Sequence, residues 1–281
     1  MIVFRRARKF LDTKKAAIKG LVYASAGTGK SWLVAKSPKP LIISTERNGL
    51  ASIAHSNPDA IVVEVENATQ LWEVILDAKD SKLTAQDEDG NEVEIEFETL
   101  VIDSLTEAQN ILKDQILIDA KRDEFILKDW NTLTNAMKKF VRLLRSLPCH
   151  VICTCLMESF MDDSSGKRHV QPLFEGKKTV QQISQYFNFV GYLYKKDGGN
   201  GVTSDLTPRF LMLDGPDNFM CKPCHPVVGV IENPSIAQIL SDIQGTEGKV
   251  TSKVSEEEVE NTKANKKPTR RRRRNHNKGE Q

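Results

Sequence analysis

The stretch ASAGTGKS, residues 24–31, has most of the features of a phosphate-binding loop. It fits the pattern G-x-x-x-x-G-K-[ST] except at its first position, where Ala24 replaces glycine. Glycines in such a loop allow backbone N–H groups to converge on phosphate oxygens. The alternative, a glycine turn with an incidental lysine, is disfavoured because an apolar strand precedes the stretch and a helix is expected after it. The residues expected to bind the nucleotide are Ala24, Ser25, Ala26, Gly27, Thr28, Gly29, Lys30 and Ser31.

Individual side chains of this loop have predicted roles in nucleotide chemistry. Lys30 is expected to contact the β- and γ-phosphates, and the Ser31 hydroxyl to ligate Mg²⁺. A triphosphate site also needs an acid that holds the metal, and Asp103 ends the apolar stretch TLVID. A helix-capping role for Asp103 is the alternative, since Asp is a common N-cap.

A second carboxylate is expected to activate water. Glu46 ends the apolar stretch PLIISTE, and ligands of open α/β sheets bind at the carboxyl ends of the strands. Glu46 is therefore the predicted catalytic base. Lys30, which is expected to contact the phosphates, is the second predicted catalytic residue. The alternative is that Glu46 provides a negative charge at the start of a following helix.

Strands and helices alternate along most of the chain. This alternation predicts an α/β fold with a mostly parallel sheet flanked by helices. Acidic residues 85–97 are expected to form a surface hairpin, and residues 158–178 a polar loop or mobile hairpin. The expected strands cover 18–24, 40–46, 60–65, 99–103, 150–157, 189–195 and 209–213, and the expected helices 30–36, 68–80, 129–147, 179–187 and 235–243.

The three motifs ASAGTGKS, LIISTE and LVIDS, in this order, resemble those of RecA-core P-loop ATPases. In particular, the chain resembles small phage-encoded RecA-core proteins, a nucleotide-binding, AAA-like group that includes single-strand DNA annealing recombinases. The likeness extends over residues 18–243 and includes the later stretches VQPLFEGKK, TPRFLML and VIENPSIAQILSDI. It implies a RecA-like P-loop NTPase core that uses ATP and Mg²⁺, with Glu46 at the family's usual position for the catalytic base.

The same resemblance implies partners and a biological role. By resemblance to the members of this phage-encoded group, the chain is expected to be an ATPase that binds single-stranded DNA and promotes annealing or recombination in phage DNA metabolism. The implied partners are single-stranded DNA, further copies of the chain with ATP at the subunit interfaces, and a single-strand DNA-binding protein. Two alternatives stay open: a ring-forming ATP-driven motor of the helicase or packaging type, and a nucleotide-dependent assembly module with negligible hydrolysis.

Two positions depart from the family pattern. Leu156 stands where the family usually has a polar sensor residue, so coupling between nucleotide state and DNA affinity is in question. The family's Lys-x-Arg pair is reduced in CKPC to Lys222, with Cys224 at the arginine position. Lys222 is the third predicted catalytic residue, expected to reach the γ-phosphate of a neighbouring subunit; slow turnover is the alternative consequence of this departure.

Charge is distributed unevenly between the body and the C-terminal end. Residues 245–281 carry 11 Lys and Arg against 6 Asp and Glu and few apolar side chains, which predicts a disordered basic tail. Such a tail has two alternative roles: it binds the phosphates of nucleic acid, or it only increases the solubility of the protein. The predicted organisation is a basic segment at 1–17, an ATPase domain at 18–244 and the tail at 245–281. The residues expected to contact DNA are Lys167, Arg168, Lys177, Lys178, Arg270, Arg271, Arg272, Arg273 and Arg274.

Further features limit the compartment and the cofactors. No apolar run reaches the roughly 18 residues of a membrane helix, and no apolar signal region follows the basic N-terminus, so a cytoplasmic location is expected. The resemblance to phage-encoded proteins implies that this is the cytoplasm of a bacterial host. The five cysteines are expected to be free thiols. The stretch CKPCH matches a haem-attachment pattern and half of a zinc site, but haem attachment requires export. A zinc ion held by Cys221, Cys224 and His225 would need a fourth ligand, with His150 or Cys149 as candidates. The sequence leaves ATP and GTP undistinguished.

Overall fold

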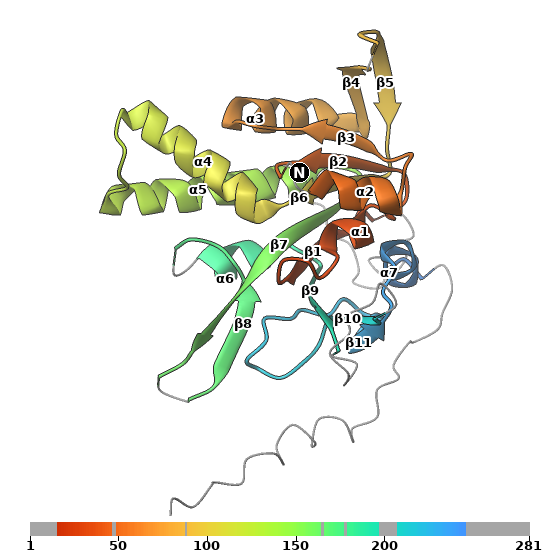
Figure 1. Cartoon of the computed structure of the whole chain (residues 1–281), viewed down its shortest axis with the longest axis vertical. Helices are drawn as coiled ribbons and strands as arrows, with labels where there is room; N and C mark the ends of the chain where they lie inside the picture. Colours follow the sequence, from red (N-terminus) through yellow and green to blue (C-terminus); the bar gives the residue numbers. More distant parts are fainter. Residues whose placement is uncertain are drawn as a thin grey trace, which may run out of the picture.

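A nine-stranded sheet forms the centre of the molecule (Figure 1). The computed structural model describes residues 16–46, 49–87, 89–163, 166–176, 179–196 and 207–245. The strand order is β11-β10-β9-β1-β7-β6-β2-β3, and β8 pairs with β7 outside this path. The strands of this sheet are β1 Lys19–Ala24, β2 Pro40–Ser44, β3 Ile61–Glu64, β6 Thr99–Asp103, β7 His150–Met161, β8 Arg168–Pro172, β9 Phe189–Lys195, β10 Arg209–Met212 and β11 Val230–Glu232.

Most strand pairs in the sheet are parallel. β9, β1, β7, β6, β2 and β3 run in one direction, whereas β8, β10 and β11 join through antiparallel pairs. A separate antiparallel hairpin, β4 Lys82–Gln86 with β5 Glu92–Glu96, confirms the predicted acidic hairpin. Because parallel neighbours share one direction, the carboxyl ends of the central strands lie at one edge of the sheet.

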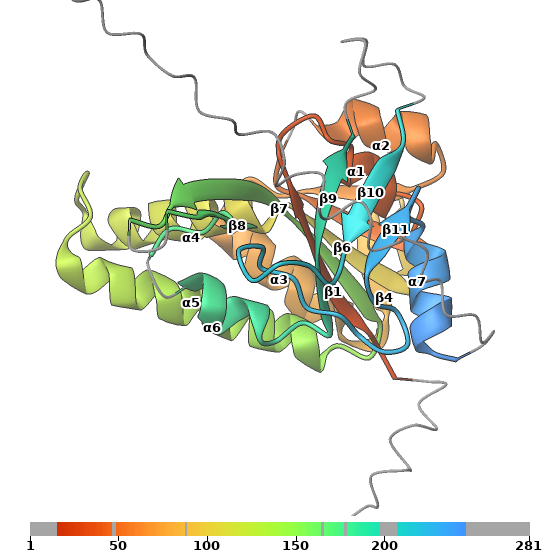
Figure 2. The same ribbon diagram turned by 90° about the horizontal axis from the view of Figure 1, so that it is seen from below.

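Helices cover both faces of the sheet, as Figure 2 shows with α7 on one side and α5 and α6 on the other. They are α1 Lys30–Val34, α2 Leu50–Ser56, α3 Ala68–Asp77, α4 Leu105–Ala120, α5 Leu127–Ser146, α6 Thr179–Ser184 and α7 Ile236–Ile243. Side chains alternate across a strand, so β1 contributes to two cores. Leu21 and Tyr23 pack with α3, α4, α5 and α6, whereas Val22 and Ala24 pack with α1, α2 and α7. Two-sided burial explains why the central strands are continuous apolar runs.

Most expected elements are present, with some differences at their ends. The predicted loop or hairpin at 158–178 contains a hairpin, because β7 continues to Met161 and pairs with β8. The helix expected over 68–80 ends at Asp77 and continues as a 3-10 turn, Ala78–Asp80. Helix α4 and strand β11 were not expected from the sequence, and α2 was expected only in the alternative that places Glu46 before a helix. In α4 the apolar residues do not form a single buried stripe, since Ile118 is 67% exposed while Ile111 is buried.

The chain ends fall outside the described residues. Residues 1–15 of the predicted N-terminal segment and residues 246–281 of the predicted tail are not described, so the proposed domain boundaries stay predictions. Within the described ranges, none of the helices combines the length and apolar character needed to cross a membrane.

Polar contacts fix the start of β1 against the turn between α5 and β7. The buried Lys19 ammonium donates to Leu147 O at 2.8 Å and to Cys149 O, and burial lowers its pKa. His150 Nδ1 accepts a hydrogen bond from Ile18 N at 3.1 Å. Burial, followed by the nearby Lys19 charge, lowers the pKa of His150. These contacts set the position of β1, and with it the loop that follows β1.

Protonation of His150 is expected to destabilise the fold. The pKa of His150 is lower in the folded chain than the usual value of about 6.5, so below that pH the unfolded chain binds more protons. Stability therefore falls as the pH drops through this range. We expect His150→Asn, which keeps an acceptor for Ile18 N, to reduce the loss of stability between about pH 8 and about pH 5. Urea unfolding at each pH measures the free energy of unfolding, and His55→Asn at an exposed position is the control. If the free energy of unfolding depends on pH equally in wild type and in His150→Asn, the assignment of this effect to His150 is contradicted.

Candidate nucleotide-binding site

The loop between β1 and α1 has the backbone that the sequence pattern requires. Ala24 is buried as the last residue of β1, and α1 begins at Lys30. Gly27 has a φ of 72° and Gly29 a φ of 102°, both in the left-handed region that favours glycine. A Cβ at Gly29 would also lie only 2.7 Å from Arg209 Nε. The loop is thus shaped for backbone N–H groups to approach a phosphate.

Lys30 lies inside the loop, close to acidic groups. Its side chain is buried, and Nζ donates to Ala24 O at 3.2 Å and Ser25 O at 3.1 Å. Burial lowers the pKa of Lys30, while the charges of Asp103 and Glu46 act in the opposite direction. The two predicted acids are therefore near enough to influence Lys30 electrostatically, and the three side chains belong to one site.

Asp103 and Ser31 face the same small space. Asp103 is 4% exposed, and a Cβ placed on Gly49 would lie 3.4 Å from Asp103 Oδ2 and 3.5 Å from Ser31 Oγ. Thr154 Oγ1 donates to the other carboxylate oxygen, Asp103 Oδ1. A carboxylate and a hydroxyl that share an opening suit Mg²⁺, which binds oxygen ligands and keeps waters or phosphates as the remainder. The residues present therefore fit the predicted metal.

Glu46 is held beside this space by the residue that follows Asp103. Ser104 Oγ donates to Glu46 Oε1, and Ser104 N donates to Thr45 Oγ1 at 2.9 Å. Thr45 N in turn donates to Asp103 O at 2.9 Å. The ends of β2 and β6 are thus joined directly. The contact with Ser104 fixes the Glu46 carboxylate near the space between Asp103 and Ser31, hereafter the metal space. There the carboxylate can accept a proton from water.

Ser104 has a second contact, with the start of α4. Its Oγ accepts from Glu107 N at 3.3 Å and so caps the helix. The capping role considered for Asp103 therefore belongs to Ser104. Asp103 keeps its carboxylate directed to Thr154 and the space beside Ser31.

Two cations from the other side of the loop contact its carbonyl groups. Lys195 Nζ donates to Gly27 O at 3.0 Å, and Arg209 Nε donates to Thr28 O at 3.0 Å. Lys195 and Arg209 are direct partners in the β9–β10 pair. Sequence reasoning missed both, although Arg209 lies within the quoted stretch TPRFLML, because their approach depends on strand pairing.

Leu156 and Lys222, the two residues at positions of family motifs, do not make the side-chain contacts with the site that the family pattern suggests. Leu156 pairs with Ala24 at the expected edge, but the contact to Asp103 comes from Thr154, two residues earlier. Lys222 Nζ donates to Phe187 O and Gln185 O, at the end of α6. Lys222 therefore does not reach the loop of its own chain, and its role in a neighbouring subunit stays a prediction.

The described DNA-contact candidates lie on the β7–β8 hairpin, which Figure 1 shows extending from the sheet. Arg168 is the first residue of β8, and its Nη2 donates to Ser159 Oγ at 2.8 Å. Lys167 precedes it. The other predicted contacts, Lys177, Lys178 and Arg270 to Arg274, lie outside the described residues.

The CKPCH stretch lacks the surroundings of a zinc site. Cys221 Sγ contacts Met212 O at 3.3 Å, and burial raises the pKa of Cys221 to about 11. His150, one candidate fourth ligand, is instead bonded to Ile18 N. Among the residues that the structure describes, no three His, Cys, Asp or Glu side chains gather in a way that could hold a metal ion.

Comparison with known families agrees with this geometry. The model of the AAA domain family matches residues 16–223, which is more than half of the chain. The chain belongs to the AAA domain family. Together with the strand order and the loop, this match identifies an AAA-type P-loop ATPase domain with a RecA-like fold, as the sequence predicted. Membership of the phage annealing group stays a prediction.

Two solved structures are similar over most of the chain. The ATPase domain of G40P shares 11% sequence identity with this chain at a TM-score of 0.42. The alignment covers 78% of this chain and 81% of the G40P domain. A DnaB-like replicative helicase, solved to show its interactions with primase, shares 12% identity at a TM-score of 0.43 over 78% of this chain. The chain spans 55% of the length of that helicase. A search of curated protein sequences found no match.

Thr154 is expected to support metal binding through Asp103. Thr154→Val keeps the shape of the side chain but removes the hydroxyl that bonds to Asp103 Oδ1. Loss of such an outer contact typically weakens metal affinity about 10-fold. We expect a Mg²⁺ titration of nucleotide binding to shift to higher Mg²⁺ by that factor. The control is Thr132→Val on the exposed face of α5, and an unchanged titration for Thr154→Val contradicts the role.

Proposed function

We propose that the chain is an ATP-binding, Mg²⁺-dependent ATPase that binds single-stranded DNA as an oligomer and promotes annealing or recombination in phage DNA metabolism. The observation that supports the ATPase part is the geometry at one edge of the sheet, where Asp103 lies beside Ser31 and Ser104 holds Glu46 next to them, after the loop that carries Lys30. Lys30, Asp103 and Glu46 each have a distinct task in phosphoryl transfer: to bind phosphate, to hold metal and to take a proton.

The proposed mechanism assigns these tasks in order. Lys30 exchanges the loop carbonyls Ala24 O and Ser25 O for phosphate oxygens, while the loop N–H groups surround the phosphates. Ser31 and Asp103 would hold Mg²⁺, which neutralises charge on the phosphates when bound. Glu46 accepts the proton of the attacking water, and Ser104 orients its carboxylate.

The DNA part of the proposal is supported by two connections from the metal space to the predicted DNA contacts. The first is β7, which carries Thr154 at the metal space and continues into the hairpin that bears Lys167 and Arg168. The second is α4, whose first turn is capped by Ser104.

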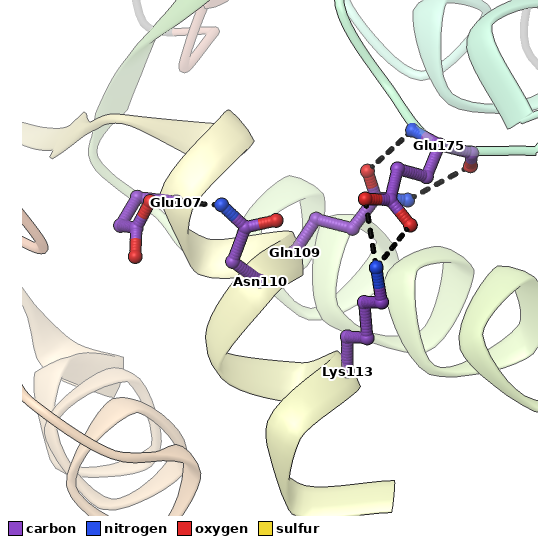
Figure 3. A network of polar contacts seen from close by, with 5 residues as sticks. All are labelled: Glu107, Gln109, Asn110, Lys113 and Glu175. Carbon is purple, nitrogen blue, oxygen red and sulfur yellow. Dashed lines mark hydrogen bonds and ion pairs between the residues drawn. The ribbon is translucent and has the colours of Figure 1, made fainter. Parts of the chain in front are cut away.

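Figure 3 shows how α4 holds the segment before Lys177 and Lys178. Gln109 forms hydrogen bonds with both main-chain groups of Glu175. Gln109 Nε2 donates to Glu175 O at 3.0 Å, and Glu175 N donates to Gln109 Oε1 at 2.7 Å. Lys113 Nζ donates to both carboxylate oxygens of Glu175, at 2.9 and 2.8 Å. The predicted DNA contacts at 177 and 178 thus follow closely after a residue fixed to α4.

Hydrolysis is expected to depend on Glu46. Glu46→Gln keeps the size of the side chain but removes the proton acceptor, so the ATPase rate should fall about 100-fold or more with ATP binding retained. Steady-state phosphate release and ATP binding measure the two properties, with the exposed Glu73→Gln as the control. A wild-type rate no faster than that of Glu46→Gln, with intact ATP binding, favours the assembly module with negligible hydrolysis.

DNA binding is expected to require ATP and Lys30. We expect a fluorescent single-stranded oligonucleotide to bind in ATP–Mg²⁺, to lose binding with Lys30→Ala, and to bind a chain truncated after Gln244. Binding should weaken steeply with salt, because phosphate contacts release counterions.

Other outcomes of this experiment distinguish the alternatives. Binding that is lost only with the tail and is indifferent to ATP contradicts the recombinase proposal. Acceleration of the annealing of complementary strands supports it, whereas directional unwinding of a duplex favours the ring-forming motor.

A further inference from the structure

Three large apolar side chains are exposed at the end of the molecule where α4 finishes and α5 begins. Ile118, in the last turn of α4, is 67% exposed, and Ile126 and Leu127, at the start of α5, are 51% and 87% exposed. Figure 1 shows this end of the two helices projecting from the body of the molecule. These three residues are hereafter the apolar knob. Single exposed apolar residues are common, but several at one projecting turn mark a surface that contacts a partner.

Neither the helix nor the core of the chain explains the apolar knob. Ile126 occupies the N-cap position of α5, where isoleucine is among the least favoured residues. Ile126 N donates to Asp129 Oδ2 at 2.9 Å, so the side chain that supports this end of the helix is that of Asp129. Leu127 is too exposed to pack in the core of its own chain. Burial of these side chains against a partner would remove their apolar surface from water.

A groove of 350 Å³ lies between α3 and α5, toward the other end of α5. Its described lining consists of Trp72 and Leu76 of α3 and Lys139 and Leu143 of α5. Leu76 is 41% exposed, and Lys139 Nζ lies 5.5 Å from the centroid of the Trp72 ring. The groove is therefore mainly apolar and has a positive charge at its border, which suits an aliphatic side chain that is followed by acidic groups.

The apolar knob of a chain cannot reach the groove of the same chain. Leu127, Lys139 and Leu143 all belong to the single helix α5. At a rise of 1.5 Å per residue, Leu127 lies about 18 Å from Lys139 and about 24 Å from Leu143 along the helix axis. The helix holds the two surfaces apart, so an apolar knob that fills the groove must come from another molecule.

Charged side chains border both surfaces with complementary signs. The exposed charged residues next to the two surfaces are Lys121, Asp123, Glu124 and Lys128 at the apolar knob and Glu73, Asp77 and Lys139 at the groove. Within the described part of the chain, none of these seven residues forms an ion pair. The apolar knob thus offers two carboxylates to the groove lysine and two ammonium groups to the acids of α3. Such complementarity favours a second copy of the chain as the occupant.

We propose that the apolar knob of one chain inserts into the groove of a second copy, with Leu127 packed against Trp72 and Leu76. Because the two surfaces differ, the contact is head-to-tail, and each copy can join two neighbours in a ring or a filament. This inference goes beyond the proposed function, which includes an oligomer but does not assign the surfaces that join its copies.

A mixing experiment tests the head-to-tail contact. Sedimentation velocity measures the assembly of wild type, Leu127→Glu at the apolar knob and Leu76→Glu at the groove, with and without ATP–Mg²⁺. Each variant should self-associate about 10-fold or more weakly than wild type, as loss of a central interface residue does. An equimolar mixture of the two variants should form dimers and nothing larger, because it retains one intact apolar knob and one intact groove. The control is Val93→Glu, which replaces an exposed apolar residue of the β4–β5 hairpin and should assemble like wild type.

Several outcomes would overturn the proposal. Wild type that stays monomeric in both conditions contradicts it, as do variants that assemble like wild type. Variants that lose assembly singly and do not form dimers when mixed contradict the head-to-tail arrangement. Lys139→Glu, at another exposed position of the groove, should also weaken assembly and keeps the test interpretable if Leu76→Glu is unstable.

ATP binding, measured on the same samples, separates this inference from the proposed function. Leu127→Glu should bind ATP like wild type, because Leu127 lies outside the phosphate loop and the metal space. Normal ATP binding with unaltered assembly in the variants overturns only the contact between copies. Failure of wild type to bind ATP overturns the proposed function and leaves the assembly result to be judged by itself.

Discussion

The parallel register of four strands is the constraint on which the site depends. Ala24 pairs with Leu156, and Ser44 pairs with Asp103, so the ends of β1, β2 and β6 lie together at one edge, beside the middle of β7. A slip of one residue in any of these pairs would turn Asp103 or Thr154 to the opposite face of the sheet. Such a slip would exchange the side chains that enter the two cores, and the close packing of both cores opposes it. The chemistry at the edge is thus specified by hydrophobic packing several residues away.

The charges at this edge are retained because each has a partner. Lys30 and Asp103 are both buried, which is costly for isolated ions. Lys30 is satisfied by Ala24 O and Ser25 O, and Asp103 by the Thr154 hydroxyl. The carbonyl contacts of Lys30 are neutral, so phosphate oxygens, which carry charge, can replace them with a gain in electrostatic energy. Binding of a triphosphate therefore exchanges weak contacts of the loop for stronger ones in the same low-dielectric space.

Features encoded by neighbouring residues were predictable from the sequence, and those created by pairing between distant residues were not. The loop, the apolar strands and the acids at their ends are local patterns, and the structure places Lys30, Ser31, Asp103 and Glu46 together. Helix α4 was missed because its apolar residues include exposed ones such as Ile118. Thr154, Ser104 and Arg209 look ordinary in the sequence, since each becomes relevant only through a partner about 50 or more residues away. The position of Lys222 likewise follows from its pairing with Val190, which takes it away from the loop.

Under the proposed function, Thr154 is the candidate for the sensor role that Leu156 lacks, on the same strand. A sensor needs a polar atom that contacts the metal space and a rigid element that leads from it to another surface. Thr154 provides the atom, and β7 provides the element, because it runs without interruption from Thr154 to the hairpin at Met161. Leu156 is also tied to α4, since its N–H donates to Thr106 Oγ1 at 3.0 Å. Strand β7 and helix α4, the two elements that lead from Asp103 and Ser104, are therefore bonded to each other next to the metal space. Under the proposed function, a shift of Asp103 on nucleotide binding would act on both elements at once, although position 156 carries no polar side chain.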